Sequence, residues 1–299
     1  MTDVLAVPAP TAAAERPARA GGVWRVLASQ TSVHSGAAVA TTLFPVAGAA
    51  GVVSMRLVIG AALLLAVGRP RLRGYSRRQW LLVGVFGAVL AGMNLAFYAA
   101  IARMPIGPVV TLEVLGPLTL SVVTARSRIA WLWALLALAG VALLGSGGFD
   151  QLDPLGVGYA FLAGTAWAGY IMLSARAGAN FPKRDGLTLA MLVAAVLALP
   201  AGLLLAGGAL LDPRVLVLGA AVAVLSSVLP YTFELTALRR LPTSTFAVLM
   251  SLGPAIAALA GFVLLGQQLH PAQIVAIGLV VAASAGVVLW RGRGPAVAA

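Results

Sequence analysis

The sequence predicts an all-α membrane protein in which ten transmembrane helices form two inverted five-helix repeats around a central cavity. Three observations predict this fold. Hydrophobic residues make up 61% of the 299 residues and charged residues only 9%, whereas soluble domains are about 45–50% apolar and about 25% charged. Ten stretches are long and apolar enough to span a bilayer as helices, and two distant stretches of the chain resemble each other.

The ten apolar stretches follow one another with short connections. Each is close to the roughly 20 residues that a transmembrane helix needs. We place them at residues 23–43, 49–68, 79–100, 106–124, 129–146, 155–177, 186–206, 214–238, 244–266 and 271–290. Residues 1–22 hold prolines and charges without an apolar core of signal-peptide length, so we expect a disordered cytoplasmic tail there, and a second tail at 292–299. The first repeat is then expected over residues 23–147 and the second over 154–291.

Basic residues fall almost entirely on one side of these helices. The chain holds 20 Lys and Arg against 8 Asp and Glu, and all of the basic residues except Arg56, Arg103 and Arg214 lie on the side that carries both termini. Short cytoplasmic loops collect Lys and Arg. We therefore expect a multi-pass protein of the bacterial cytoplasmic membrane with both termini in the cytoplasm. The excess of positive charge reflects this topology, and nucleic acid is not an expected partner.

An internal repeat relates the two halves. Residues 100–117 read AIARMPIGPVVTLEVLGP and residues 237–254 read ALRRLPTSTFAVLMSLGP, with matching alanine, arginine, proline and Leu-Gly-Pro positions and no gap. Five helices are an odd number, so the second copy enters the membrane from the opposite side. Inverted repeats of this kind are the architecture of many secondary transporters, which expose one central site to either side in turn.

Three prolines lie within the predicted spans. Pro117 and Pro254 are repeat equivalents, and Pro230 lies inside 214–238. A proline removes a backbone hydrogen bond and bends its helix, and in lipid the freed carbonyl must face protein or a wet cavity. We interpret these prolines as hinges, with kinks that merely suit packing as the alternative.

Ionisable residues inside the spans are the next candidates, because each costs about 2.5–3.5 kcal/mol to insert and needs a partner or a function. Arg56, Glu113 and Glu234 are in this position. A guanidinium pairs with a carboxylate as a two-pronged fork, so Arg56 is a candidate clamp for a substrate carboxylate. Each glutamate is a candidate for binding an amino group or carrying a proton. Structural ion pairing is the alternative for all three.

Polar and aromatic residues also recur at helical spacing on four spans. They are Gln30 and His34, Asn94 and Tyr98, Trp167 and Tyr170, and Tyr231 with Glu234. Residues three or four apart share a helix face. Interhelical hydrogen bonding explains any single pair, but four pairs together predict a shared polar cavity. We expect these residues and the charged ones to bind substrate.

The sequence lacks the motifs of several other functions. There are no cysteines, and no phosphate-binding loop, metalloprotease motif or nucleophile elbow occurs. We expect no cofactor, no metal and no enzyme activity. An intramembrane enzyme using His34 with a glutamate, or a non-transporting scaffold, is a remote alternative. Membrane lipid is an expected partner, and we expect a monomer or a weak homodimer through residues 129–146 and 271–290.

The chain resembles the ten-helix EamA-type exporters of the drug/metabolite transporter superfamily. It is most similar to the threonine/homoserine exporter group and next to the aromatic amino acid exporters. The resemblance rests on LFPVAGAAGVVSMRL (43–57), GMNLAFYAAIARMP with TLEVLGP (92–117), AWAGYIMLSARAG (166–178) and LPYTFELTALRRLPTSTFAVLMSLGPAIAALAG (229–261).

This resemblance implies a cavity surrounded by the first four helices of each repeat, with the fifth and tenth helices outside it. It implies export of amino acids and related small metabolites, of the threonine, homoserine, methionine-like or aromatic kind, by alternating access. A multidrug or nucleoside-type exporter is the alternative. Relatives commonly carry glutamates at two places where this sequence has Gly253 and Gln267; any proton coupling here would fall to Glu113 and Glu234.

Overall fold

The protein is seen here in a computed structural model, which describes residues 12–71, 73–125, 128–146, 153–182, 185–230, 233, 237 and 249–291. All regular structure in these residues is helical, as predicted. The helices are α1 (Ala12–Thr41), α2 (Phe44–Gly68), α3 (Arg77–Ile101), α4 (Ile106–Glu113), α5 (Leu115–Ala125), α6 (Arg128–Ser146), α7 (Pro154–Asn180), α8 (Asp185–Ala206), η2 (Gly207–Leu211), α9 (Pro213–Ala223), η3 (Val224–Val228), α12 (Gly253–Leu265) and α13 (Pro271–Arg291).

The described helices coincide with the predicted spans, with three differences. The expected span 244–266 is interrupted by a turn at Ser251 and Leu252, and α12 begins at Gly253. Helix α1 begins at Ala12, inside the stretch expected as a disordered tail; its alanine, glutamate and arginine residues favour helix. The expected span 106–124 is broken at Val114 into α4 and α5. The break lies three residues before Pro117, whose missing N–H cannot bond to the Glu113 carbonyl.

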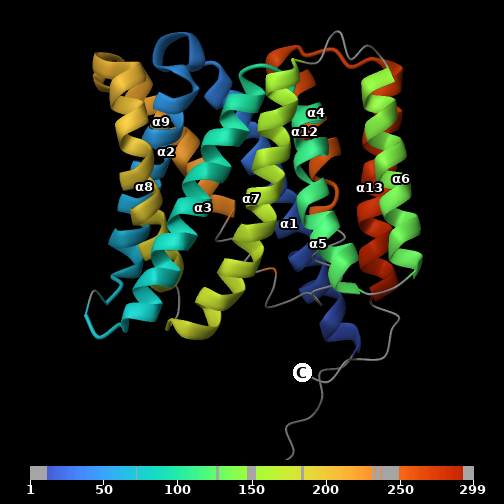
Figure 1. The fold of residues 1–299 in the computed structure, drawn as a ribbon, viewed down its shortest axis with the longest axis horizontal. Coiled ribbons are helices and arrows are strands. Elements are labelled where there is room, and N and C mark those ends of the chain that lie inside the picture. Colours follow the sequence, from blue (N-terminus) through green and yellow to red (C-terminus); the bar gives the residue numbers. More distant parts are fainter. Residues whose placement is uncertain are drawn as a thin grey trace, which may run out of the picture.

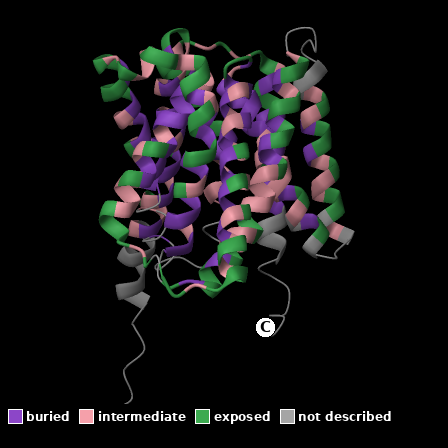
Figure 2. Cartoon of the chain, turned by 60° about the vertical axis from the view of Figure 1, so that its left-hand side comes forward, coloured by how far each residue is buried: buried purple, intermediate pink, exposed green. Residues whose placement is uncertain are grey.

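The helix surfaces are those of a membrane protein. Among the described residues, α2, α3, α7 and the α8–η2 stretch are long and apolar enough to cross a bilayer. Buried residues gather inside the bundle, whereas exposed residues lie on outward faces and at helix ends (Figure 2). The outward faces carry large apolar side chains such as Leu81, Leu204 and Val217. Exposed apolar surface on this scale marks contact with lipid.

The helices run side by side and alternate in direction (Figure 1). Helix α1 rises from the lower end of the view and α7, its counterpart in the second half, descends from the upper end. The arginine-bearing loop between α2 and α3 lies at the lower end, whereas the turn between α3 and α4 lies at the upper end. The two halves therefore run in opposite directions, as an inverted repeat requires.

Helices α6 and α13 form a pair at one side of the bundle (Figure 1). They approach closely at glycines: a Cβ built on Gly140 would lie 2.9 Å from the Ala276 carbonyl oxygen, and one on Gly286 would meet the Trp133 ring. Small residues allow such approach between membrane helices. No described residue of this pair lines the central cavity.

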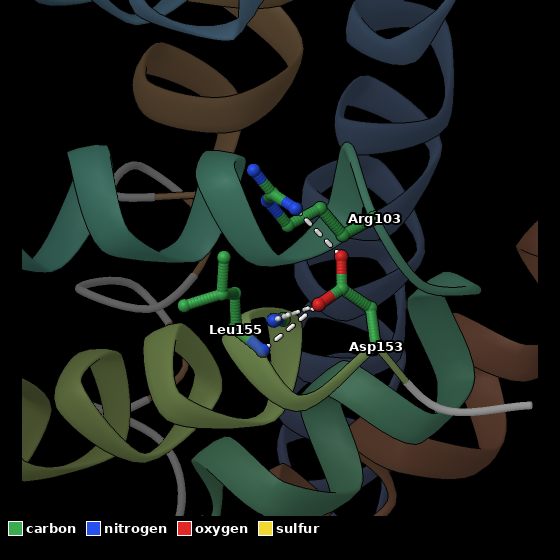
Figure 3. A network of polar contacts seen from close by, with 4 residues as sticks. Arg103, Asp153 and Leu155 are labelled. Atoms are coloured by element: carbon green, nitrogen blue, oxygen red, sulfur yellow. Dashed lines mark hydrogen bonds and ion pairs between the residues drawn. The ribbon is translucent and has the colours of Figure 1, made fainter. Parts of the chain in front are cut away.

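At the upper end, an ion pair joins the α3–α4 turn to the start of α7 (Figure 3). Arg103 Nη1 lies 2.6 Å from Asp153 Oδ2, and Asp153 Oδ1 caps α7 by accepting hydrogen bonds from the Leu155 and Gly156 N–H groups. The hydrogen bond from Arg103 holds the pKa of Asp153 below its usual range. The stabilisation from this pair is therefore present above the ordinary aspartate pKa and is lost as the pH falls through the lowered value.

At the lower end, buried Asp185 at the start of α8 holds the arginine-bearing loop. Its Oδ2 accepts hydrogen bonds from the Tyr75 hydroxyl at 2.7 Å and the Arg71 N–H at 3.2 Å. Burial, together with this hydrogen bond, raises the pKa of Tyr75 to about 12. The α2–α3 loop is thus fastened to the second half of the chain.

The closest helix crossing lies between the α4–α5 break and α7. A Cβ on Gly116 would collide with the Gly164 carbonyl, and a Cβ on Gly164 would lie 2.5 Å from the Glu113 carbonyl oxygen. Both neighbours are backbone atoms, which have no side-chain rotation by which to move away. These glycines bring Glu113 to the middle of the bundle.

We predict that Gly164→Ala destabilises the protein by about 1–3 kcal/mol, the range for overpacked sites. The matched control is Gly92→Ala in α3, where a Cβ meets no atom within 4 Å and the higher helix propensity of alanine is expected to add about 0.5–1 kcal/mol. Unfolding of the two purified variants in detergent measures both effects. Equal stability of the two variants would contradict the close crossing.

Candidate functional site

A cavity lies at the middle of the bundle, between helices of both halves of the chain. It holds about 930 Å³ of empty space, including its opening to solvent. Seven of the predicted substrate-binding residues line it: Gln30, His34, Arg56, Asn94, Glu113, Trp167 and Tyr170. Its remaining wall is formed by Val33, Met93, Phe97, Val110, Val114, Ser226, Pro230, Met250, Gly253 and Pro254.

Arg56 on α2 connects three helices across one side of the cavity. Its Nη1 donates to Asn94 Oδ1 at 2.8 Å, and its Nη2 donates to the Ser226 carbonyl at 3.0 Å. Asn94 is itself fixed, because its Nδ2 donates to the Leu90 carbonyl at 2.8 Å. The guanidinium also lies 5.6 Å from the centre of the Tyr98 ring, within cation–π range. These contacts orient the guanidinium and leave its Nε without a partner.

The Ser226 carbonyl is available to Arg56 because of Pro230. In an α-helix this carbonyl would accept from the N–H of residue 230, which proline lacks. The turn before the proline is a π-helix (η3), in which the Leu229 N–H bonds to the Val224 carbonyl. In a π-helix the Leu225 carbonyl would accept from the N–H of residue 230, five residues later, which proline lacks. It instead accepts a hydrogen bond from Ser32 Oγ at 2.7 Å. Both carbonyls that Pro230 leaves open are thus satisfied by side chains of α1 and α2.

Pro254 has the same effect on the opposite wall. It leaves the Met250 carbonyl, four residues earlier, without its helical donor. Gln30 Nε2 from α1 donates to this carbonyl at 3.1 Å. The polar side chains of the cavity therefore have a structural task, which is to satisfy backbone groups that water cannot reach in a membrane.

Pro117, the repeat equivalent of Pro254, leaves the Glu113 carbonyl open in the same way. This carbonyl faces the backbone of Gly164 on α7. Pro117 itself does not line the cavity, whereas Pro230 and Pro254 do. The proline therefore acts on the site indirectly, by ending α4 next to Glu113.

Buried polar atoms without a partner are concentrated at this cavity. The described part of the chain holds five such side-chain atoms, and three of them belong to cavity residues: His34 Nδ1, Arg56 Nε and Ser226 Oγ. Buried polar groups in native proteins are nearly always hydrogen-bonded. These three atoms therefore indicate where a bound molecule or water completes the site.

Glu113 adds an acidic side chain to the same cavity. Its carboxyl group forms no ion pair with Arg56, although both residues line the cavity. An arginine and a glutamate that face one cavity without pairing with each other leave both side chains available to a ligand.

The other predicted site residues have different positions. Tyr98 is fully buried behind Arg56, with its hydroxyl 3.5 Å from Nη1, and does not line the cavity. Tyr231 and Glu234 lie outside the described residues. The sequence interpretation missed Ser226, which is nonetheless signalled by its position four residues before Pro230. It also missed the apolar wall residues, which nothing in the sequence distinguishes from core residues.

Gln267 lies away from the cavity, at the end of the bundle that carries Arg103. Its Oε1 accepts from the Ile106 N–H at 3.2 Å, which caps the start of α4 from the end of α12. Below this cap the two helices touch, because a Cβ on Gly107 would lie 2.8 Å from Ala258 Cβ. Helices α4 and α12 are therefore in close contact on this side of the cavity.

Comparison with known proteins identifies the family. The EamA-like transporter family model matches residues 154–289. Threonine/homoserine exporter RhtA of Escherichia coli K12 is 40% identical over 263 residues, which cover 87% of this chain and 89% of RhtA. The chain belongs to the EamA-like transporter family. It is therefore a multi-pass membrane transporter.

Other relatives also match over most of the chain. RhtA of Salmonella typhimurium LT2 is 40% identical, with 90% of this chain and 92% of the relative covered. The uncharacterized transporter YwfM of Bacillus subtilis 168 is 28% identical, with 76% and 79% covered. A protein of known crystal structure, 23% identical, superposes with a TM-score of 0.57 over 93% of this chain and 99% of its own, which supports the fold.

We predict that the loss of stability caused by Gln30→Leu depends on the presence of Pro254. In the native background the variant leaves the Met250 carbonyl unpaired and is expected to lose about 1 kcal/mol of stability, at the low end for an orphaned buried group. In a Pro254→Ala background the new N–H serves this carbonyl, so the same change should cost less. Unfolding of the four proteins gives the coupling.

Thr31→Val, on the exposed face of α1, is the control for both backgrounds. If Gln30→Leu lowers the stability equally with and without Pro254, Gln30 does not serve to pair the carbonyl that Pro254 leaves open.

Proposed function

We propose that this protein exports small amino acids, of the threonine and homoserine kind, across the bacterial cytoplasmic membrane. The observation that carries the proposal is the cavity between the two halves, in which the basic Arg56 and the acidic Glu113 face the same space without pairing with each other. The names of the RhtA relatives support the substrate class.

The charges of the cavity suit a zwitterion. The Nε–H of Arg56 has no partner, while the other hydrogen bonds of this guanidinium hold its orientation. We assign the substrate carboxylate to this group, since charge-assisted hydrogen bonds between guanidinium and carboxylate are strong and directional. Glu113 is assigned to the substrate ammonium group. A drug without charge would leave both residues unsatisfied in a low-dielectric environment, which disfavours a multidrug exporter.

The rest of the wall limits the substrate side chain. Val33, Met93, Val110, Phe97 and Trp167 surround the cavity with apolar surface. Such a wall accepts short aliphatic side chains, and the flexible Met93 leaves room for methionine-like or aromatic ones. Threonine and homoserine suit a cavity that combines Arg56 and Glu113 with an apolar wall. We therefore propose these two amino acids as the preferred substrates.

We propose alternating access between the two halves as the mechanism. Helices α4 and α12 are in close contact on the Arg103 side of the cavity, so passage between them requires these helices to separate. Pro117, Pro230 and Pro254 interrupt the helices next to the cavity and are the proposed hinges. We place both termini in the cytoplasm, on the side that carries most arginines, and assume a monomer or a weak homodimer through α6 and α13.

We predict that purified protein in liposomes transports labelled threonine above the level of empty vesicles. Arg56→Gln and Glu113→Gln should each reduce the initial rate by at least tenfold, because each variant leaves one charge of the zwitterion unpaired. Thr165→Val on the exposed face of α7 should keep the native rate.

Absence of flux for every amino acid tested, in protein that is folded by size exclusion, would overturn the proposed function. Native rates in both charge variants would instead remove Arg56 and Glu113 from the site.

A further inference from the structure

We infer that His34 recognises the hydroxyl group of the substrate side chain and so determines the preference for hydroxylated amino acids. This inference rests on the proposed function, which places the carboxylate and ammonium groups at Arg56 and Glu113. It assigns to a third residue the group that distinguishes threonine and homoserine from aliphatic amino acids of the same size.

The first observation is the state of the His34 side chain. It lines the cavity, is only 6% exposed, and its Nδ1 has no hydrogen-bond partner. A buried polar atom without a partner is unfavourable. A hydroxyl group in the cavity that completed the hydrogen bond would remove this penalty.

The second observation is that the imidazole and its neighbour Gln30 lie against a glycine. Gly253 on α12 lies opposite them, and a Cβ at this position would come within 3.5 Å of His34 Nε2 and 3.0 Å of Gln30 Nε2. A larger residue at this position would crowd both polar side chains. Gln30, one turn before His34 on the same helix face, is already engaged by the Met250 carbonyl. Of this polar pair on α1, His34 is the member that remains available.

The chemistry of imidazole matches a hydroxyl group. A neutral imidazole has one N–H donor and one acceptor nitrogen, and a hydroxyl group offers one donor and two acceptor lone pairs. The two can pair whichever ring nitrogen carries the proton. An aliphatic side chain in the same place would leave Nδ1 unpaired. Sites built to bind a substrate hydroxyl reject analogues that lack it far more strongly than apolar pockets reject a missing methylene.

Val33 and Val110 line the same cavity as the imidazole. They provide apolar contact for the methyl or methylene groups that accompany the hydroxyl. In this arrangement the cavity binds three groups of the substrate: its carboxylate at Arg56, its ammonium group at Glu113 and its hydroxyl group at His34.

The test uses 2-aminobutyrate, which is the deoxy analogue of both threonine and homoserine. Full-length protein in liposomes is assayed for the initial rates of labelled threonine and 2-aminobutyrate, and unlabelled homoserine competes with each. The native protein should prefer threonine by about tenfold or more. His34→Phe should bring this ratio close to one, because it removes the hydrogen-bonding partner of the hydroxyl group. His34→Gln, which keeps a donor and an acceptor, should retain most of the preference.

Thr31→Val is the control on the exposed side of α1 and should keep the native ratio. A native ratio close to one would overturn the inference without any variant, and so would a His34→Phe protein that keeps the native ratio or loses both substrates equally. If His34→Phe does not fold, His34→Leu takes its place under the same criteria. Failure of the proposed function appears differently, as absence of flux for all amino acids in the native protein.

Discussion

Backbone carbonyls that proline leaves open are the constraint around which the centre of this protein is organised. Within a bilayer, an unpaired helix carbonyl has no water with which to form a hydrogen bond. Pro230 and Pro254 create such unpaired carbonyls at Ser226 and Met250. Arg56 and Gln30 satisfy them from neighbouring helices. The polar side chains of the cavity therefore hold the broken helices together, and the same groups line the proposed site.

The inverted repeat places a proline-broken helix in each half. Pro117 and Pro254 occupy equivalent places in helices that run in opposite directions. The two open carbonyls have different neighbours, because Glu113 faces the Gly164 backbone whereas Met250 faces the Gln30 amide. The halves share a fold but have different cavity chemistry. One contributes the acidic Glu113 and the other contributes Gly253, which lies against Gln30 and His34.

Much of this structure is predictable from the sequence. Apolar length and the prolines at the starts of α7, α9 and α13 fix the helices, and helical spacing brings Gln30 and His34 to one cavity. The position of an open carbonyl, four residues before a proline, is equally predictable. Its partner is not, because Arg56 reaches Ser226 across 170 residues of chain. The π-helical turn at 224–228 and the placement of Tyr98 behind Arg56 also depend on tertiary packing, which no local pattern encodes.

The one-sided placement of arginine has an energetic consequence for the whole molecule. The loop between α2 and α3, together with the first turn of α3, carries Arg69, Arg71, Arg73, Arg77 and Arg78, and moving one elementary charge through a membrane potential of 100 mV requires about 2.3 kcal/mol. Carrying this segment across an energised membrane would therefore require more than about 10 kcal/mol from the potential alone, by the same relation. Once inserted, the protein keeps its orientation. A transported molecule must therefore cross by rearrangement of the helices, while the arginine-bearing segments stay on one side of the membrane.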